Sequence, residues 1–319
     1  MRSTGESVIK EGKMAKPEKV EIVEVGPRDG LQNLQFYVET GKKVQLIRLL
    51  AESGIRAIEA TSFVHPRAIP QFRDAAETIA GIKGLPGVKI IALVPNLVGA
   101  QRALAAGVQE ISFVFSISAS HNRNNVNKTP GESLEELRQI FELPGMGTRW
   151  MIRVNLATSF GCPFEGILPD ERVYDYVDEV VDMGAKDIAL ADTVGYGNPA
   201  QVRRIVSNCL KRYPERHFII HLHNTRGLGL ANALAAYEAG LRTFDSAIGG
   251  LGGCPYAPGA TGNISTEDLV FMFEGMGVKT GIRFPELFKA GQYLREIVPG
   301  VELSSGVLKA GLPKGILAA

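Results

Sequence analysis

Short apolar runs rich in Val, Ile, Phe and Leu recur along the chain and predict eight β-strands. Most of these runs are continuously apolar rather than alternating, which is typical of parallel strands that are covered on both faces. In chain order the runs are VEIVEV from Val20, AIEATSF from Ala57, KIIALV from Lys89, EISFVFS from Glu110, WMIRVNLAT from Trp150, DIALADT from Asp187, HFIIHLH from His217 and TFDSAIGG from Thr243.

Segments with helical periodicity lie between these runs. The segment TGKKVQLIRLLAESG predicts a helix with Thr40 as its N-cap and an end at Gly54. In LPDERVYDYVDEVVDMG, Pro169 and acidic residues occupy the first turn, and Gly184 ends the helix. The same pattern recurs in PAQVRRIVSNCLKRYP, LGLANALAAYEAG and TEDLVFMFEGMG. A strand followed by a helix, eight times over, predicts an α/β fold of the (β/α)8 TIM-barrel type.

The main alternative is a doubly wound open sheet, which usually has fewer strands. Its dinucleotide-binding forms carry a glycine pattern after the first strand, where this chain has GPRDGLQN. We expect residues 19–319 to form a single TIM-barrel catalytic domain, with additional C-terminal helices from about residue 281 that include FPELFKAGQYLREIV. Residues 1–18 are polar and contain a second methionine, Met14, so we expect a disordered tail there.

Composition narrows the class of protein. With 45% apolar and 22% charged residues, the 319-residue chain is typical of globular proteins with a large core. Its 35 basic and 34 acidic side chains give a net charge of +1, so we expect neither a nucleic acid nor a membrane as partner. Because the start lacks the apolar core of a secretory signal, a cytoplasmic location is expected. Three cysteines, Cys162, Cys209 and Cys254, argue against a disulfide framework.

Polar residues at the predicted strand ends indicate a metal site, since TIM-barrel active sites lie at the carboxyl ends of the strands. His221 and His223 are two positions apart on one strand, so both should point to the same face, with Leu222 facing the helices. Asp29 follows the first strand, which lies beside the eighth strand in a closed barrel, and could complete the set. Hydrogen-bonded structural histidines and an Asx turn at Asp29 are the alternatives. Nitrogen and oxygen ligands with open positions favour Mg²⁺ or Mn²⁺ over a structural Zn²⁺.

Four further residues are candidates for the chemistry. Arg28 could stabilise an oxygen that gains negative charge, or could form an ion pair with Glu59 or Asp192. Those two acids would then orient Arg28 and the histidines. Cys254 lies in GGLGGCPYAPGATGN, a composition suited to a mobile lid, and could carry a proton, whereas Cys209 is expected to be a buried helix residue.

These segments resemble the hydroxymethylglutaryl-CoA lyase family of metal-dependent TIM-barrel lyases, from about Val20 to Gly281. The resemblance is carried by VEIVEVGPRDGLQN, EATSFVHPRAIPQ, GCPFEG, ADTVG, HLHNTRG and GGLGGCPYAPGATGN. It implies that Asp29, His221, His223 and Asn263 bind the cation. Arg28 resembles the family's enolate-stabilising arginine, Cys254 its catalytic loop cysteine, and Glu59 and Asp192 its supporting acids. Asn263 rests on the resemblance alone.

The implied reaction is a retro-Claisen cleavage of 3-hydroxy-3-methylglutaryl-CoA to acetoacetate and acetyl-CoA, with His221 or Asp192 as the expected base. The resemblance also implies an acyl-CoA substrate and a homodimer. The alternatives are a lyase for a related 3-hydroxyacyl-CoA, a Claisen-type synthase, an aldolase and a non-enzymatic protein that binds CoA metabolites. Related synthases carry a C-terminal regulatory region for which this sequence is too short.

Two departures from the family pattern leave the acyl group open. The stretch from Leu34 to Tyr37 replaces the usual Glu-Lys. Asn224 and Arg226 follow the histidines where many members have Asp and then Tyr or Arg.

Overall fold

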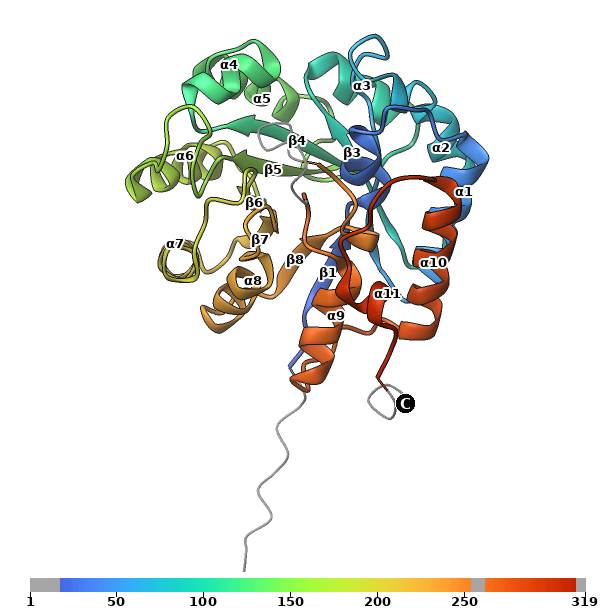
Figure 1. The fold of residues 1–319 in the computed structure, drawn as a ribbon. Coiled ribbons are helices and arrows are strands. Elements are labelled where there is room, and N and C mark those ends of the chain that lie inside the picture. Colours follow the sequence, from blue (N-terminus) through green and yellow to red (C-terminus); the bar gives the residue numbers. More distant parts are fainter. Residues whose placement is uncertain (1–17, 254–261, 314–319) are drawn as a thin grey trace, which may run out of the picture.

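The eight strands of the computed structural model, which describes residues 18–253 and 262–313, form a closed parallel barrel (Figure 1). Each strand pairs with its neighbours in chain order, and the first pairs with the eighth. The strands are β1 (Glu21–Glu24), β2 (Ala57–Ser62), β3 (Lys89–Val94), β4 (Glu110–Ser116), β5 (Met151–Ala157), β6 (Asp187–Asp192), β7 (His217–Leu222) and β8 (Thr243–Ser246). The predicted TIM barrel is confirmed, and the open sheet is excluded.

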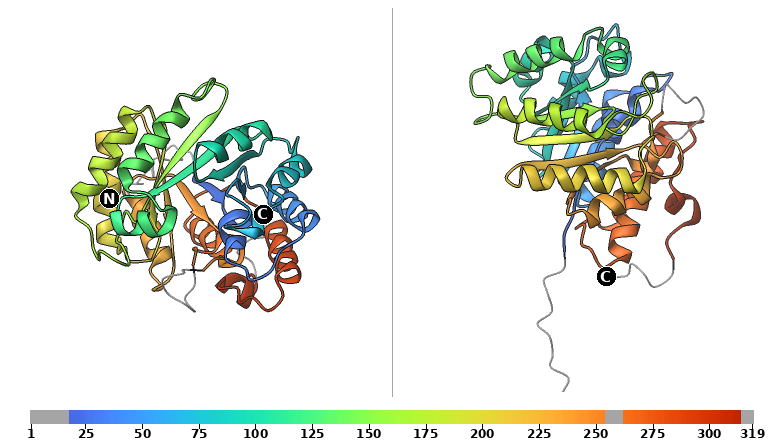
Figure 2. Two further views of the ribbon diagram at one scale, coloured as in Figure 1. Left: turned by 90° about the horizontal axis from the view of Figure 1, so that it is seen from above. Right: turned by 90° about the vertical axis from the view of Figure 1, so that its left-hand side faces the viewer.

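Helices surround the barrel, as Figure 2 shows from two directions. They are α1 (Thr40–Glu52), α2 (Ala75–Ile82), α3 (Leu97–Ala105), α4 (Ala119–Val126), α5 (Pro130–Phe141), α6 (Asp170–Asp182), α7 (Pro199–Arg212), α8 (Gly229–Glu238), α9 (Thr266–Gly275), α10 (Phe284–Ile297) and α11 (Gly306–Ala310). The connection from β4 to β5 contains both α4 and α5, so the predicted single helix per strand is wrong there. The expected C-terminal helices beyond Gly281 are α10 and α11, and α10 packs beside α1.

Local sequence explains how individual helices begin. Asn198 caps α7 by accepting a hydrogen bond from the Gln201 backbone N–H, and Pro199 occupies the first turn. The predicted N-cap of α1 is wrong by one residue, because Glu39 occupies that position and Thr40 is already helical. The Thr40 hydroxyl instead donates to the Asp74 carboxylate at 2.6 Å.

The segment that follows β1 is a π-helical turn, η1 (Gly26–Gly30), which carries Arg28 and Asp29. The sequence placed Asp29 directly at the end of the strand, whereas β1 ends at Glu24 and the turn intervenes. A Cβ at Gly26 would lie 2.6 Å from the Glu24 carboxylate and 2.8 Å from the Ile248 side chain, so only glycine fits without displacement. This packing holds η1 against the turn η3 (Ile248–Gly250) that follows β8.

Two expectations concern the ends of the chain and its location. The expected tail of residues 1–18 lies outside the described residues except for Glu18, whose carbonyl accepts a hydrogen bond from the Lys279 N–H at 2.8 Å. None of the helices in the described part of the chain has both the length and the apolar character required to span a bilayer.

Candidate active site

Asp29, His221 and His223 meet at the carboxyl end of the barrel. Each offers one ligand atom, and these three atoms lie within 4.8 Å of one another. His221 is on β7, His223 directly follows that strand, and the two imidazole rings are 5.2 Å apart. Leu222 between them is buried in the core, as the alternation along a strand predicts. The structure therefore brings together the three residues that the sequence suggested as candidate metal ligands.

The protonation states of this cluster suit a divalent cation. The buried Nδ1 of His223 has no hydrogen-bond partner among the described residues. Burial and the neighbouring His221 lower the pKa of His223 to about 3, so its imidazole is neutral, the form that binds metals. Burial opposes the ionisation of Asp29, but Arg28 and the two histidines outweigh it and hold the Asp29 pKa below its usual value. The neutral His223 nitrogen beside the anionic Asp29 oxygen fits a divalent cation.

Asn263 lies next to this cluster although it is far away in sequence. Its backbone forms an isolated β-bridge with His223, and its amide nitrogen donates to Asp29 Oδ2 at 2.7 Å and to the Leu251 carbonyl at 3.2 Å. Asn263 is thus hydrogen-bonded to Asp29 and forms a β-bridge with His223, and both of these residues are candidate ligands. Its role as a fourth ligand stays a prediction.

Arg28 forms the ion pair with Glu59 that was one of its two expected roles. Its Nε donates to Glu59 Oε2 at 2.5 Å, and its guanidinium also pairs with Asp29. Burial alone would lower the pKa of Arg28, but the charges of Glu59 and Asp29 outweigh it, so the pKa is raised. Arg28 also lines the cavity. It is therefore an ion-paired cation that faces the cavity.

Asp192, one of the two expected bases, is the last residue of β6. Its side chain is fully buried, and its two oxygens accept hydrogen bonds from the backbone N–H groups of Tyr196, at 2.8 Å, and Gly197, at 3.0 Å. Burial raises the Asp192 pKa to about 6. Among the described residues, its neighbour Thr193 lines the cavity and Asp192 does not. Asp192 holds the loop that follows β6.

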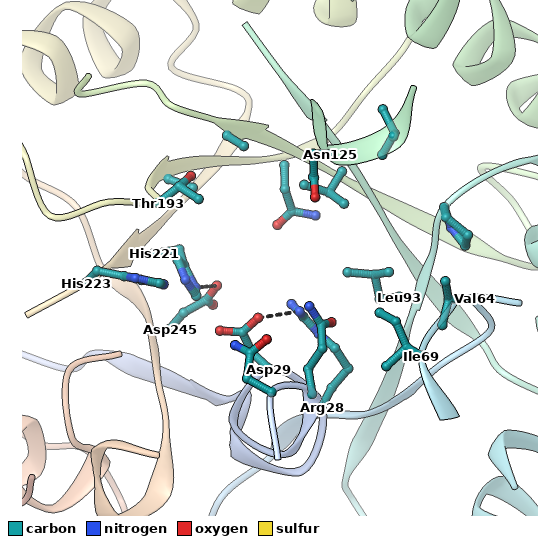
Figure 3. Close-up of a pocket in the computed structure, with 18 of the residues that line it drawn as sticks. Arg28, Asp29, Val64, Ile69, Leu93, Asn125, Thr193, His221, His223 and Asp245 are labelled. Atoms are coloured by element: carbon teal, nitrogen blue, oxygen red, sulfur yellow. Dashed lines mark hydrogen bonds and ion pairs between the residues drawn. The ribbon is translucent and has the colours of Figure 1, made fainter. Parts of the chain in front are cut away.

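A cavity of about 240 Å³ opens beside the cluster. In Figure 3 the two histidines lie on one side, Val64, Ile69 and Leu93 lie on the opposite side, and Arg28 and Asp29 lie between them. Sequence reasoning missed most of the lining, which includes Gln32, Asn33, Val64, Ile69, Leu93, Pro95, Val114, Asn125, Asn155, Thr193 and Asp245. For Asn155 and Asp245 a signal was available, because a polar side chain within an otherwise apolar barrel strand must point into the interior.

The stretch from Leu34 to Tyr37, which departs from the family pattern, is not part of this lining in the described structure. Leu34 is buried, and the Tyr37 ring packs against the Arg73 guanidinium at 3.7 Å. The second departure from the family pattern includes Arg226, which also lies outside the described lining. Its side chain donates a hydrogen bond to the Val194 carbonyl at 2.8 Å. Within residues 18–253 and 262–313, neither departure contributes a residue to the cavity lining.

Two of the three cysteines lie within the described residues. Cys254 lies outside the described residues, but Gly253, immediately before it, lines the cavity. Cys209 is buried in α7, as predicted, and burial raises the pKa of its thiol to about 12. Cys162 is also a buried free thiol.

Comparison with known proteins identifies the family. The family model described as HMGL-like matches residues 19–294. The chain belongs to this hydroxymethylglutaryl-CoA lyase-like family. It is 43% identical over 283 residues to the hydroxymethylglutaryl-CoA lyase of Bacillus subtilis, covering 89% of this chain and 94% of the relative. It is 41% identical to the cytoplasmic 3-hydroxy-3-methylglutaryl-CoA lyase of Rattus norvegicus, covering 88% of this chain and 82% of that protein.

Solved structures agree with this membership. An HMG-CoA lyase from Acinetobacter baumannii, in complex with coenzyme A and 3-methylmalate, superposes with a TM-score of 0.89 at 44% identity. That match covers 95% of this chain and 98% of the other. Membership of the family makes this chain a lyase rather than a non-enzymatic binding protein.

Proposed function

We propose that this chain cleaves 3-hydroxy-3-methylglutaryl-CoA to acetoacetate and acetyl-CoA. The observation that carries the proposal is the convergence of Asp29, His221, His223 and Arg28 on one cavity at the carboxyl end of the barrel. The relatives named above as lyases of this thioester support the choice of substrate.

The proposed cofactor is Mg²⁺ or Mn²⁺, held by Asp29, His221 and His223, with Asn263 as the fourth protein ligand. Such a cation, when bound, polarises the oxygen atoms of the substrate and makes its tertiary hydroxyl more acidic. The buried, unpartnered Nδ1 of His223 and the ionised Asp29 support this assignment.

His221 and Asp192 are the two proposed bases for the tertiary hydroxyl. Both oxygens of Asp192 accept backbone hydrogen bonds from the loop that follows β6, and burial raises its pKa to about 6. Nδ1 of His221 is paired with Asp245 at 3.2 Å, and its other nitrogen is assigned to the cation. Transfer of the hydroxyl proton to one of these two side chains, His221 or Asp192, is the proposed first step.

Arg28 supplies the positive charge for the second half of the reaction. Cleavage of the carbon–carbon bond leaves acetyl-CoA as its enolate, with negative charge on the thioester oxygen. The Arg28 guanidinium offsets that charge, and Glu59 holds it in place. Cys254 then delivers a proton to the enolate carbon, an assignment supported by the family resemblance and by the position of Gly253 in the cavity wall.

A lyase for a related 3-hydroxyacyl-CoA is the second candidate. The wall opposite the histidines includes the apolar side chains of Val64, Ile69 and Leu93, and so suits a hydrocarbon substituent at the 3-position. A Claisen-type synthase would use the same site to form the bond rather than to break it.

The test is a product analysis on purified protein supplied with Mn²⁺. 3-Hydroxy-3-methylglutaryl-CoA and homologues with longer 3-alkyl groups are incubated separately, and acetyl-CoA and the keto acid are quantified by chromatography. Equal amounts of acetoacetate and acetyl-CoA from the methyl compound are expected. Faster cleavage of a longer homologue would favour the second candidate, and no product from any thioester would refute a lyase acting on 3-hydroxyacyl-CoA.

The homodimer and the cytoplasmic location also belong to this proposal. Light scattering during gel filtration is expected to give twice the chain mass of 34.4 kDa. Fractionation of the source cells is expected to recover the activity with the cytoplasm.

A further inference from the structure

A series of buried polar side chains crosses the barrel interior and ends at His221. The register of the sheet pairs His221 on β7 with Asp245 on β8. His221 Nδ1 and Asp245 Oδ2 are hydrogen-bonded at 3.2 Å, shown as a dashed line in Figure 3. The Asp245 side chain is only 2% exposed, so this contact is almost completely shielded from water.

Asp245 is itself held from across the barrel. Arg153 on β5 donates from Nη1 to Asp245 Oδ1 at 3.0 Å and from Nη2 to Oδ2. Its Nε donates to Asn155 Oδ1 at 2.9 Å, and the Asn155 amide donates to Ser112 Oγ at 2.8 Å. A two-point contact of this kind fixes both the rotation and the negative charge of a carboxylate.

The geometry has a direct consequence for His221. An ionised carboxylate can only accept hydrogen bonds, so the His221 nitrogen that faces Asp245 must carry the proton. In the neutral imidazole this leaves the lone pair on Nε2, where a metal ligand needs it. Metal-binding histidines commonly have such a carboxylate partner on the second nitrogen.

We propose that Asp245, held by Arg153, is a positioning residue that sets the tautomer and ring orientation of His221 for binding the cation. Asp245 does not bind the cation in this scheme. The inference deepens the proposed function and rests on it, because it assumes that His221 is a metal ligand.

The barrel contains a matched control pair at its other end. His217 Nδ1 lies 2.6 Å from Asp187 Oδ1, and His217 Nε2 lies 2.7 Å from the Thr243 hydroxyl. His217 is at the start of β7, away from the cavity. Asp187→Asn therefore removes the same kind of contact from a histidine that has no role in metal binding.

The first experiment measures Mn²⁺ affinity by electron paramagnetic resonance of the free ion, with no substrate present. Asp245→Asn is expected to weaken binding by about 10- to 100-fold, the usual effect of losing such a partner. Asp187→Asn is expected to leave the affinity unchanged. Because Asp245→Asn leaves Arg153 buried without its counter-charge, the double variant Arg153→Met/Asp245→Asn is measured as well. Wild-type affinity in a folded variant that lacks the Asp245 carboxylate would overturn the proposal.

The second experiment needs no folded Asp245 variant and no metal. Long-range ¹H–¹⁵N correlation spectra of the metal-free wild-type protein report the tautomer of each of its five histidines. The His221 signals are identified by their loss in His221→Gln. A proton on Nδ1 is expected, and a proton on Nε2 would overturn the proposal. Failure of the wild-type protein to bind Mn²⁺, with the Nδ1 proton present, would instead refute the proposed metal site.

Discussion

Arg28 and Glu59 lie 31 positions apart in the sequence and form an ion pair at the carboxyl end of the barrel, with Arg28 Nε 2.5 Å from Glu59 Oε2. The Glu59 side chain is only 3% exposed, whereas Arg28 also lines the cavity. This pair holds the guanidinium of Arg28, and Glu59 is not among the described residues that line the cavity.

Glu59→Gln tests that relationship. Loss of the negative charge should let the Arg28 guanidinium shift, and a misplacement of about 1 Å can lower a rate by about 100-fold. We expect kcat to fall by that order while Mn²⁺ affinity stays unchanged, measured by steady-state kinetics and metal titration. Glu110→Gln, which breaks the ion pair with Lys89 at 3.3 Å near the start of β4, is the matched control. Equal losses in both variants would show that Glu59 matters only for stability.

Arg28→Lys provides a second test of charge placement. Lysine keeps the positive charge but loses the planar group that contacts Glu59 and Asp29 simultaneously. We expect kcat to fall by about 100- to 1,000-fold, as for the loss of a group that stabilises developing negative charge. Near-normal kcat in Arg28→Lys would contradict a role for the guanidinium geometry.

Cys254→Ala separates proton delivery from metal binding. If Cys254 protonates the enolate carbon, its loss should reduce turnover by about 100- to 10,000-fold, the range for general acid–base groups. Mn²⁺ affinity should be unaffected because the ligands remain. Cys209→Ala is the cysteine control, since that thiol is buried in α7. Full turnover in Cys254→Ala would remove the residue from the mechanism.

Strand periodicity explains which residues of the site could be predicted from the sequence. His221 and His223 were predictable because alternate residues of a strand share a face, and Asp29 because β1 closes the barrel against β8. Asn263 was not predictable from spacing, since its contact with Asp29 depends on a β-bridge to His223 across 40 residues. The loop-holding role of Asp192 was also missed, because strand position does not reveal which backbone groups a carboxylate meets.

Glu24 provides a pH-dependent prediction about stability. Burial outweighs its hydrogen bonds with Thr266, Ile248 and Gly26 and raises its pKa from 4.5 to about 8. Between those values the folded chain holds a proton that the unfolded chain releases, so the free energy of unfolding should fall as pH rises, by up to about 1.4 kcal/mol per pH unit. The contribution is complete below pH 4.5 and is lost above about pH 8.

Glu24→Gln should flatten this dependence, since glutamine resembles the protonated side chain and does not titrate. Urea unfolding at several pH values measures both proteins. Glu267, whose pKa burial raises to about 7, remains in the variant, so part of the slope will persist. Parallel curves for wild type and Glu24→Gln would contradict the raised pKa of Glu24.

The most direct test of the account titrates Mn²⁺ into metal-free protein while bound Mn²⁺ and cleavage of 3-hydroxy-3-methylglutaryl-CoA are measured on the same samples. We predict that the cleavage rate rises in proportion to the occupancy of one site per chain, and that His223→Ala loses both the bound Mn²⁺ and the activity. Full cleavage by the metal-free protein in excess chelator, or unchanged Mn²⁺ binding in His223→Ala, would contradict the account.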